Sequence, residues 1–381
     1  MRRVLLALIL AVLVTPACAQ KAQAPAVHAI PFQFVMQRQI VFPMTVDGKP
    51  AEAWLDSGAS ATVLDMAFAK KLGIELGQAI TARGVAGQVT DVRLARADLV
   101  AGDLAMPGRR IVVMDLSNIA RITHRPVEVL LGRDVFDQAV VDIDFEGRKL
   151  ELIPRDAFRP PSGAPVPLKP SADLRSLPIE VAGTPMQAIL DLGNSGGLLI
   201  DREFADHYRL FDGRPLSNDL GVGAEGAREQ ALAELDKVSV GGMRFDRVPT
   251  VATAGLSSRA PANVGIEILS RFHLTIDYAG DRIWMTPYAD AATRPFRKNR
   301  AGLALVPEGA ALVVEFVAAG SPAERAGWRK GDHVTALDGR PIAPDYAVSE
   351  ASLWIFGPAG RTVVLSDGQG RPKKLTLADY Y

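Results

Sequence analysis

The chain has one cysteine, five histidines and no excess of either charge among its 381 residues. A single cysteine, Cys18, excludes a disulfide framework within the chain and any cysteine-rich metal site. The histidines form no His-x-x-x-His pair and no acidic loop has calcium-site spacing, so we expect no metal and no cofactor. Because lysine plus arginine equals aspartate plus glutamate at 43 each, we expect no nucleic-acid partner and no anionic membrane surface as a partner.

No apolar run in the sequence is long enough to span a bilayer, which needs about 20 residues. The run at residues 4–14 follows two arginines and precedes a small-x-small triplet at residues 17–19. This order is typical of a secretory signal peptide, which we place at residues 1–19 and which predicts a periplasmic or secreted protein. Cys18 also resembles the attachment cysteine of a lipoprotein, so a lipid anchor there stays open as an alternative.

Long helical patterns are scarce, whereas 26 prolines and 34 glycines supply many turn formers. This balance predicts a mostly β protein, and the length predicts two or three domains. A Pro- and Gly-rich stretch at residues 159–165 and a polar stretch at residues 293–300 would separate them. We expect a first domain at residues 28–158, a second at residues 165–290 and a third at residues 298–381.

What the sequence does contain is an internal repeat. Residues 46–56 align with residues 181–191, and in both segments a glycine stands eight residues, and a proline six residues, before a final aspartate. The far ends of the two copies agree as well, because Gly132 and Gly265 are each followed by an aspartate twelve residues later. Spacings that persist over this length indicate a duplication, so the first two domains should share one fold.

Each copy ends an apolar, strand-like run on its aspartate, Asp56 in the first and Asp191 in the second. Two carboxylates held about 3 Å apart cannot both ionise, so one acts as an acid while the other acts as a base. Such a pair hydrolyses a peptide bond by activating a water, and it needs no metal. We predict Asp56 and Asp191 as this catalytic pair. The residues expected to support the two loops are Ser57, Gly58, Ser60, Gly193 and Ser195.

At these residues the chain resembles the pepsin and retropepsin superfamily of aspartyl proteases, and bacterial retropepsin-like domains in particular. Residues 54–59, Trp-Leu-Asp-Ser-Gly-Ala, are similar to its active-site strand and turn, and residues 130–132, Leu-Leu-Gly, to the segment behind that turn. The resemblance covers residues 30–155 and, more weakly, residues 165–290. It implies two pseudo-symmetric acid-protease β lobes with a substrate cleft between them and flaps over the cleft. The residues it implies for the first flap are Gly84 and Gly87.

The second copy departs from this family pattern directly after its aspartate. Leu192 stands where the family has threonine or serine, whose hydroxyl braces the two loops across the lobes. Asn194 or Ser195 would have to replace that bond. Two alternatives therefore stay open: a peptide-binding protein that keeps the cleft without catalysis, and a homodimer that pairs two Asp56 residues.

Residues 298–381 follow a different pattern. A strand leads through Gly-Ser-Pro into a short helix, which a glycine ends, and Gly-Asp then opens a second strand that closes on Asp-Gly. This order resembles a bacterial PDZ domain, an α+β fold that binds extended polypeptide by strand addition at a sheet edge. The resemblance implies peptide binding at Gly302, Leu303, Ala304 and Leu305, with Ala304 where the family often has a second glycine. The whole sequence thus predicts an exported aspartic endopeptidase with a polypeptide partner.

Overall fold

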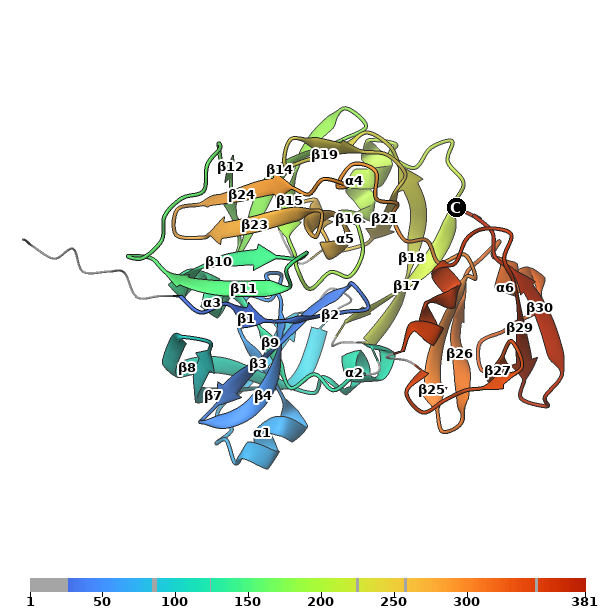
Figure 1. Cartoon of the computed structure of the whole chain (residues 1–381), viewed down its shortest axis with the longest axis horizontal. Helices are drawn as coiled ribbons and strands as arrows, with labels where there is room; N and C mark the ends of the chain where they lie inside the picture. The colour runs from blue at the N-terminus through green and yellow to red at the C-terminus, as the bar shows by residue number, and fades with distance from the viewer. Residues whose placement is uncertain (1–26, 84–87, 124, 224–225, 257–258, 347–348) are drawn as a thin grey trace, which may run out of the picture.

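The computed structural model describes residues 27–83, 88–123, 125–223, 226–256, 259–346 and 349–381 (Figure 1). The predicted signal peptide at residues 1–19, with Cys18, and the predicted flap residues Gly84 and Gly87 lie outside these ranges. Strands dominate and form four sheets, so the fold is mostly β, as the composition predicts. Within the described ranges, no helix has the length and apolar character needed to cross a membrane.

The first lobe is built on a sheet with the strand order β2-β3-β4-β9-β5-β8-β7-β6. Every second residue of β7 from Ala95 to Ala101 is buried, the period-2 pattern of a strand with one face on a core. The strands are β2 (Gln33–Val35), β3 (Gln39–Val46), β4 (Lys49–Leu55), β5 (Val63–Asp65), β6 (Ala79–Arg83), β7 (Gln88–Ala101), β8 (Leu104–Met114) and β9 (Val129–Leu131). The helices are α1 (Met66–Leu72), α2 (Ser117–Thr123) and α3 (Arg133–Gln138).

The second lobe repeats this arrangement. Its path β14-β15-β22-β16-β21-β18 matches β3-β4-β9-β5-β8-β7 strand for strand, with parallel and antiparallel pairings at the same places. The duplication predicted from the spacings is therefore present in the fold. The elements are β13 (Lys169–Ser171), β14 (Leu174–Val181), β15 (Thr184–Leu190), β16 (Leu198–Asp201), α4 (Arg202–His207), β17 (Ser217–Gly223), β18 (Gly226–Leu235), β19 (Val238–Val240), β20 (Met243–Phe245), β21 (Val248–Thr253), β22 (Ala262–Val264) and α5 (Ile266–Leu269).

The same tight turn leads into each aspartate strand. Asp47 and Gly48 join β3 to β4 with φ of 47° and 72°, and Ala182 and Gly183 join β14 to β15 with φ of 51° and 86°. Two consecutive residues with positive φ make the hairpin turn whose twist matches that of the strands, and glycine adopts it without strain. The glycine that stands eight residues before each aspartate therefore has a conformational cause.

A third sheet, with the order β1-β11-β10-β23-β24-β12, joins the two lobes. Strand β10 of the first lobe pairs antiparallel with β23 of the second, with Asp142 opposite Thr275. One continuous hydrophobic core runs from the first lobe through this sheet into the second, so the relative position of the lobes is fixed. The strands are β1 (Ile30–Pro31), β10 (Ala139–Asp144), β11 (Lys149–Pro154), β12 (Val166–Pro167), β23 (Phe272–Asp277) and β24 (Arg282–Pro287).

The C-terminal part has a sheet of its own, with the order β25-β26-β27-β29-β30 and β28 paired to β27. Its hydrophobic core, which includes Trp328 and Trp354, is separate from that of the lobes. In Figure 1 this part, orange to red, lies beside β17 and β18 of the second lobe. Its elements are β25 (Leu303–Glu308), β26 (Ala311–Val317), α6 (Pro322–Arg325), β27 (His333–Leu337), β28 (Arg340–Pro341), η2 (Glu350–Phe356), β29 (Thr362–Asp367) and β30 (Pro372–Thr376).

Candidate active site

The two predicted aspartates lie at equivalent places in the two lobes. Asp56 follows β4 and Asp191 follows β15, and each begins the loop that faces the other lobe. The backbone N–H of Asp56 donates to the Leu131 carbonyl at 3.0 Å, and that of Asp191 donates to the Val264 carbonyl at 3.1 Å. Each loop is therefore tethered to the neighbouring parallel strand of its own lobe.

The glycines after the aspartates show how closely the loops approach. A Cβ atom placed on Gly58 would lie 2.5 Å from Cγ of Asp191, and one placed on Gly193 would lie 2.4 Å from Cγ of Asp56. Each carboxyl group thus occupies the space that a side chain would need on the opposite loop, and each group lies close enough to act on the pKa of the other. The structure brings the predicted pair together within one chain.

A single hydroxyl braces the two loops across the lobes. Ser57, which is fully buried, donates from Oγ to the Leu190 carbonyl at 2.8 Å and accepts from the Leu192 N–H at 2.9 Å. The reciprocal bond cannot form, because Leu192 has no hydroxyl, and its side chain is buried in the core instead. The loops therefore stay paired with half of the bracing that a hydroxyl on both sides would provide.

The other polar residues of the two loops do not form hydrogen bonds across the lobes. Asn194 accepts the Gly196 N–H at 2.9 Å and donates to Asn263 at 2.8 Å, so it braces its own lobe rather than the opposite one. Ser60 is exposed and Ser195 is half-buried. Among the described residues, neither hydroxyl bonds to the aspartates.

Sequence reasoning missed Asn263, whose side chain donates to Oδ2 of Asp191. It lies on β22, in the segment equivalent to residues 130–132, where the resemblance leads one to expect an apolar residue. An amide in an otherwise apolar segment is visible in the sequence and could have marked Asn263. Its bond to Asp191 could not be foreseen in the same way, because the two residues are 72 positions apart.

Burial and mutual repulsion both act on the pair. Removal from water is the largest cause that raises the pKa of Asp56, and the charge of Asp191 raises it further. Burial also raises the pKa of Asp191, but donors from Asn263, Asn194 and Gly193 act against that rise. These donors favour the ionised form of Asp191, and the pair retains one proton over a range in which isolated aspartates have none.

A hairpin leads to the predicted first flap, and a second hairpin stands at the equivalent place in the second lobe. Strands β6 and β7 pair up to Arg83 opposite Gln88, and β17 and β18 pair up to Gly223 opposite Gly226. Helix α2 of the first lobe packs against β17 of the second, so this second hairpin reaches across to the opposite lobe.

The predicted peptide-binding residues lie at the start of the first strand of the C-terminal sheet. Gly302 has φ of 75°, and a Cβ atom on it would lie 2.1 Å from Cβ of Ser321, so both conformation and space require glycine. Leu303, Ala304 and Leu305 begin β25, an edge strand that pairs with β26 on one side among the described strands. Leu303 is buried in the core of this sheet.

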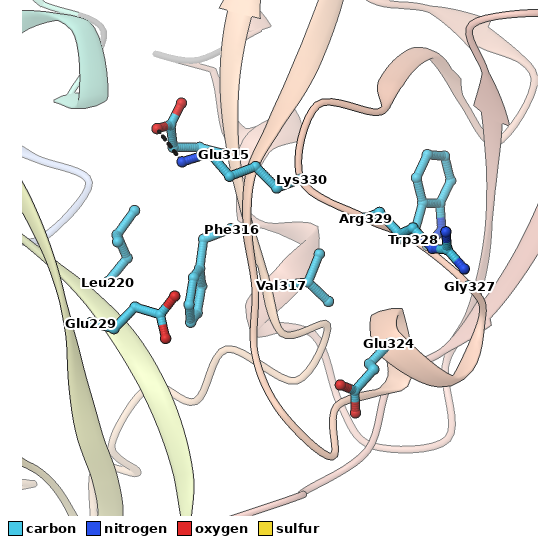
Figure 2. A pocket seen from close by; sticks show the side chains of 10 residues that line it. All are labelled: Leu220, Glu229, Glu315, Phe316, Val317, Glu324, Gly327, Trp328, Arg329 and Lys330. Carbon is cyan, nitrogen blue, oxygen red and sulfur yellow. Dashed lines mark ion pairs between the residues drawn. The ribbon is translucent and has the colours of Figure 1, made fainter.

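A pocket of about 490 Å³ separates the second hairpin from the C-terminal sheet, as Figure 2 shows. Phe316 and Val317 of β26 face it, and Lys330 pairs with Glu315 at 3.5 Å on its border. The residues around it are Leu220, Glu229, Glu315, Phe316, Val317, Glu324, Gly327, Trp328, Arg329 and Lys330. The aspartate pair does not line it.

Comparison with known proteins agrees with the geometry of the lobes. The model of a family described as aspartyl protease matches residues 42–135 and 177–267, and each segment contains one of the paired aspartates. No curated protein matches the chain significantly. The family match supports assignment of the two lobes to the aspartyl proteases, and it ends before the C-terminal sheet begins.

Replacing Gly193 by alanine is expected to force the two loops apart, because the new methyl group would overlap the Asp56 carboxyl group. Overpacking of this kind costs about 1–3 kcal/mol of unfolding free energy. Gly196→Ala in the same loop is the control, since its Cβ atom would lie 3.4 Å from its nearest neighbour. Denaturant unfolding measures both variants, and equal stability would contradict the close approach.

Ser57→Ala should destabilise the protein by about 1–3 kcal/mol, because the buried Leu192 N–H loses its acceptor. Ser60→Ala, which changes an exposed hydroxyl in the same loop, should leave the unfolding free energy within about 0.5 kcal/mol of the parent. The same unfolding assay compares them. A Ser57→Ala protein as stable as Ser60→Ala would show that the brace across the lobes contributes nothing.

Proposed function

We propose that the protein is an aspartic endopeptidase that hydrolyses polypeptide with a water activated by Asp56 and Asp191. The close approach of these two carboxyl groups, Asp191 buried and Asp56 partly buried, one from each half of a duplicated fold, is the observation that carries the proposal. The aspartyl protease family match over both lobes supports the same reaction.

The reaction needs one carboxylate and one carboxylic acid at the same time. The carboxylate takes a proton from a water while the water oxygen bonds to the carbonyl carbon, and the acid gives its proton to the carbonyl oxygen. Collapse of the tetrahedral intermediate breaks the C–N bond. The carboxyl group that took the proton from water gives it to the leaving nitrogen, and the other regains a proton from a hydroxyl of the intermediate as the carbonyl reforms. A pair that shares one proton in a buried site provides both forms together.

We also propose that the C-terminal sheet binds extended polypeptide in the manner of the PDZ domains that it resembles. Strand β25 has an open edge among the described strands, and a left-handed Gly302 precedes it. An unpaired strand edge offers backbone donors and acceptors to an incoming strand. From the export signal predicted in the sequence we propose that this activity lies in the periplasm or outside the cell, with a lipid anchor at Cys18 as the alternative to simple cleavage of the signal.

The same C-terminal part is in a position to gate the cleft. Ser217 Oγ at the start of β17 donates to the Ala319 carbonyl at 2.7 Å, and the Ala319 N–H donates to Asn218 Oδ1 at 2.7 Å. Arg121 of helix α2 pairs with Glu315 of β26 at 3.1 Å. We infer that these contacts hold the C-terminal sheet against the second hairpin and helix α2, and that their release admits substrate.

Asp56→Asn and Asp191→Asn are each expected to lower the rate of peptide cleavage by about 10²-fold or more, because each removes one half of the acid–base pair. Cleavage of an unfolded protein substrate from pH 3 to pH 7 measures the rate. Asp206→Asn, on the exposed surface of α4, is the control and should retain activity.

The pattern of results separates the alternatives. Loss of activity in Asp56→Asn with activity retained in Asp191→Asn would indicate a homodimer that pairs two Asp56 residues. No cleavage by the parent protein at any pH, together with measurable peptide binding, would overturn the enzyme assignment and leave a binding protein. Leu192, which removes one brace, is the residue that favours this second function.

Loosening the gate should speed the cleavage of long substrates. Arg121→Ala combined with Asn218→Ala removes the ion pair with Glu315 and the bond to Ala319, together worth about 1 kcal/mol or about fivefold in the open population. We expect a similar increase in the cleavage rate and in amide exchange along β17. Arg209→Ala is the control on an exposed pair, and unchanged exchange in the double variant would argue against the gate.

A further inference from the structure

One polar side chain breaks the symmetry of the aspartate pair. Asn263 on β22 aligns in parallel register with Ile189, just as Leu130 on β9 aligns with Trp54, so Asn263 and Leu130 are equivalent. The first lobe therefore has an apolar side chain where the second lobe has an amide. Asn263 is 8% exposed, and a buried amide needs partners for both its ends.

The orientation of this amide is fixed by a backbone donor. The Gly196 N–H can donate and cannot accept, so the atom of Asn194 that faces it at 2.9 Å is the carbonyl oxygen. The Asn194 amide nitrogen then donates to Oδ1 of Asn263 at 2.8 Å. This leaves the Asn263 NH₂ group directed at Oδ2 of Asp191. Because both ends of this chain of bonds are determined, Asp191 must accept at that oxygen.

The other donors to the pair are backbone N–H groups of the two loops. Gly58 donates to Oδ1 of Asp56 and Gly193 to Oδ1 of Asp191, both at 2.9 Å. The Asn194 N–H donates to Oδ1 of Asp191 at 3.0 Å, whereas the Ala59 N–H donates to the main-chain carbonyl of Asp56 at 3.2 Å. Within the part of the chain that the structure describes, the Asn263 amide is the side-chain donor to the pair, and leucine stands at its equivalent position in the first lobe. This amide is also the strongest influence that lowers the pKa of Asp191 against the effect of burial.

The other titratable groups near Asp191 do not supply this asymmetry. Asp56 faces it from the first lobe, and Tyr278 lies beyond the end of β23 with its ring stacked on Phe136 at 4.9 Å. Burial raises the pKa of Tyr278 above its usual range, so the phenol stays neutral. The Arg175 guanidinium lies 5.4 Å from the centre of that ring and pairs with Asp281 at 2.7 Å.

We propose that Asn263 is a positioning residue that keeps Asp191 as the carboxylate of the pair and leaves the shared proton on Asp56. This inference rests on the proposed function for its consequence. In peptide hydrolysis, Asp191 takes the proton from water, and Asp56 protonates the carbonyl oxygen of the substrate. The different roles of the two equivalent loops are thereby set by a buried side chain that acts through Asp191.

The test replaces Asn263 by leucine, the residue at the equivalent position of the first lobe. Loss of a hydrogen bond to a charged group should raise the pKa of Asp191 by about one unit, a tenfold change in its ionisation constant. Titration of the protein with ¹³C-labelled aspartate carboxyl groups measures this directly, and the Asp191 resonance is identified by its absence in Asp191→Asn. If leucine prevents folding, Asn263→Ser, whose hydroxyl is too short to reach Asp191, should give the same shift.

Peptide cleavage gives the second readout. The acidic limb of kcat/KM should move to higher pH by about one unit, because Asp191 without its donor becomes protonated at a higher pH. An Asp191 ionisation constant equal to that of the parent in the folded variants would overturn the proposal. The titration needs no substrate. A shift in the Asn263 variants together with no cleavage by the parent protein would therefore contradict the proposed function and leave the role of Asn263 intact.

Discussion

The close approach of two carboxyl groups across a duplicated interface is the constraint on which the rest of the molecule depends. Each group lies where the other loop would otherwise carry a side chain, so Gly58 and Gly193 are both required. Holding like charges at that distance is unfavourable unless one of them is protonated. The fold supplies the necessary rigidity through the β10–β23 pairing and a hydrophobic core shared by both lobes.

Two departures from symmetry act on this constraint in different ways. Leu192 removes one of two possible braces. The other remains, because the Ser57 hydroxyl donates to one backbone group of the opposite loop and accepts from another. Asn263 adds a donor to one carboxyl group. A reaction that needs one acid and one base does not require the two loops to be identical. The duplicated site can therefore lose the second hydroxyl brace at Leu192 and gain the Asn263 donor while its two loops stay together.

The repeat predicted the fold of both lobes because duplicated spacings fix duplicated topology. A glycine eight residues before each aspartate marks the same hairpin turn, and a second glycine, Gly132 or Gly265, follows the strand beside each aspartate loop. The bonds of Asn263 could not be predicted from one sequence, since they depend on which way an amide points in three dimensions. The contact of Arg121 with Glu315, 194 residues apart, likewise follows from how separately folded parts pack.

The strength of the contacts around the C-terminal sheet decides how it can move. Lys298 is 3% exposed and lies 3.0 Å from Glu234 at the end of β18, and breaking a buried pair of this kind costs about 3–5 kcal/mol. The contacts at Asn218 and Glu315 lie nearer the surface and together cost about 1 kcal/mol to break, and a pocket separates the surfaces between them. Because the sheet has its own core, rotation about Lys298 would release the hairpin while the carboxyl pair stays in place.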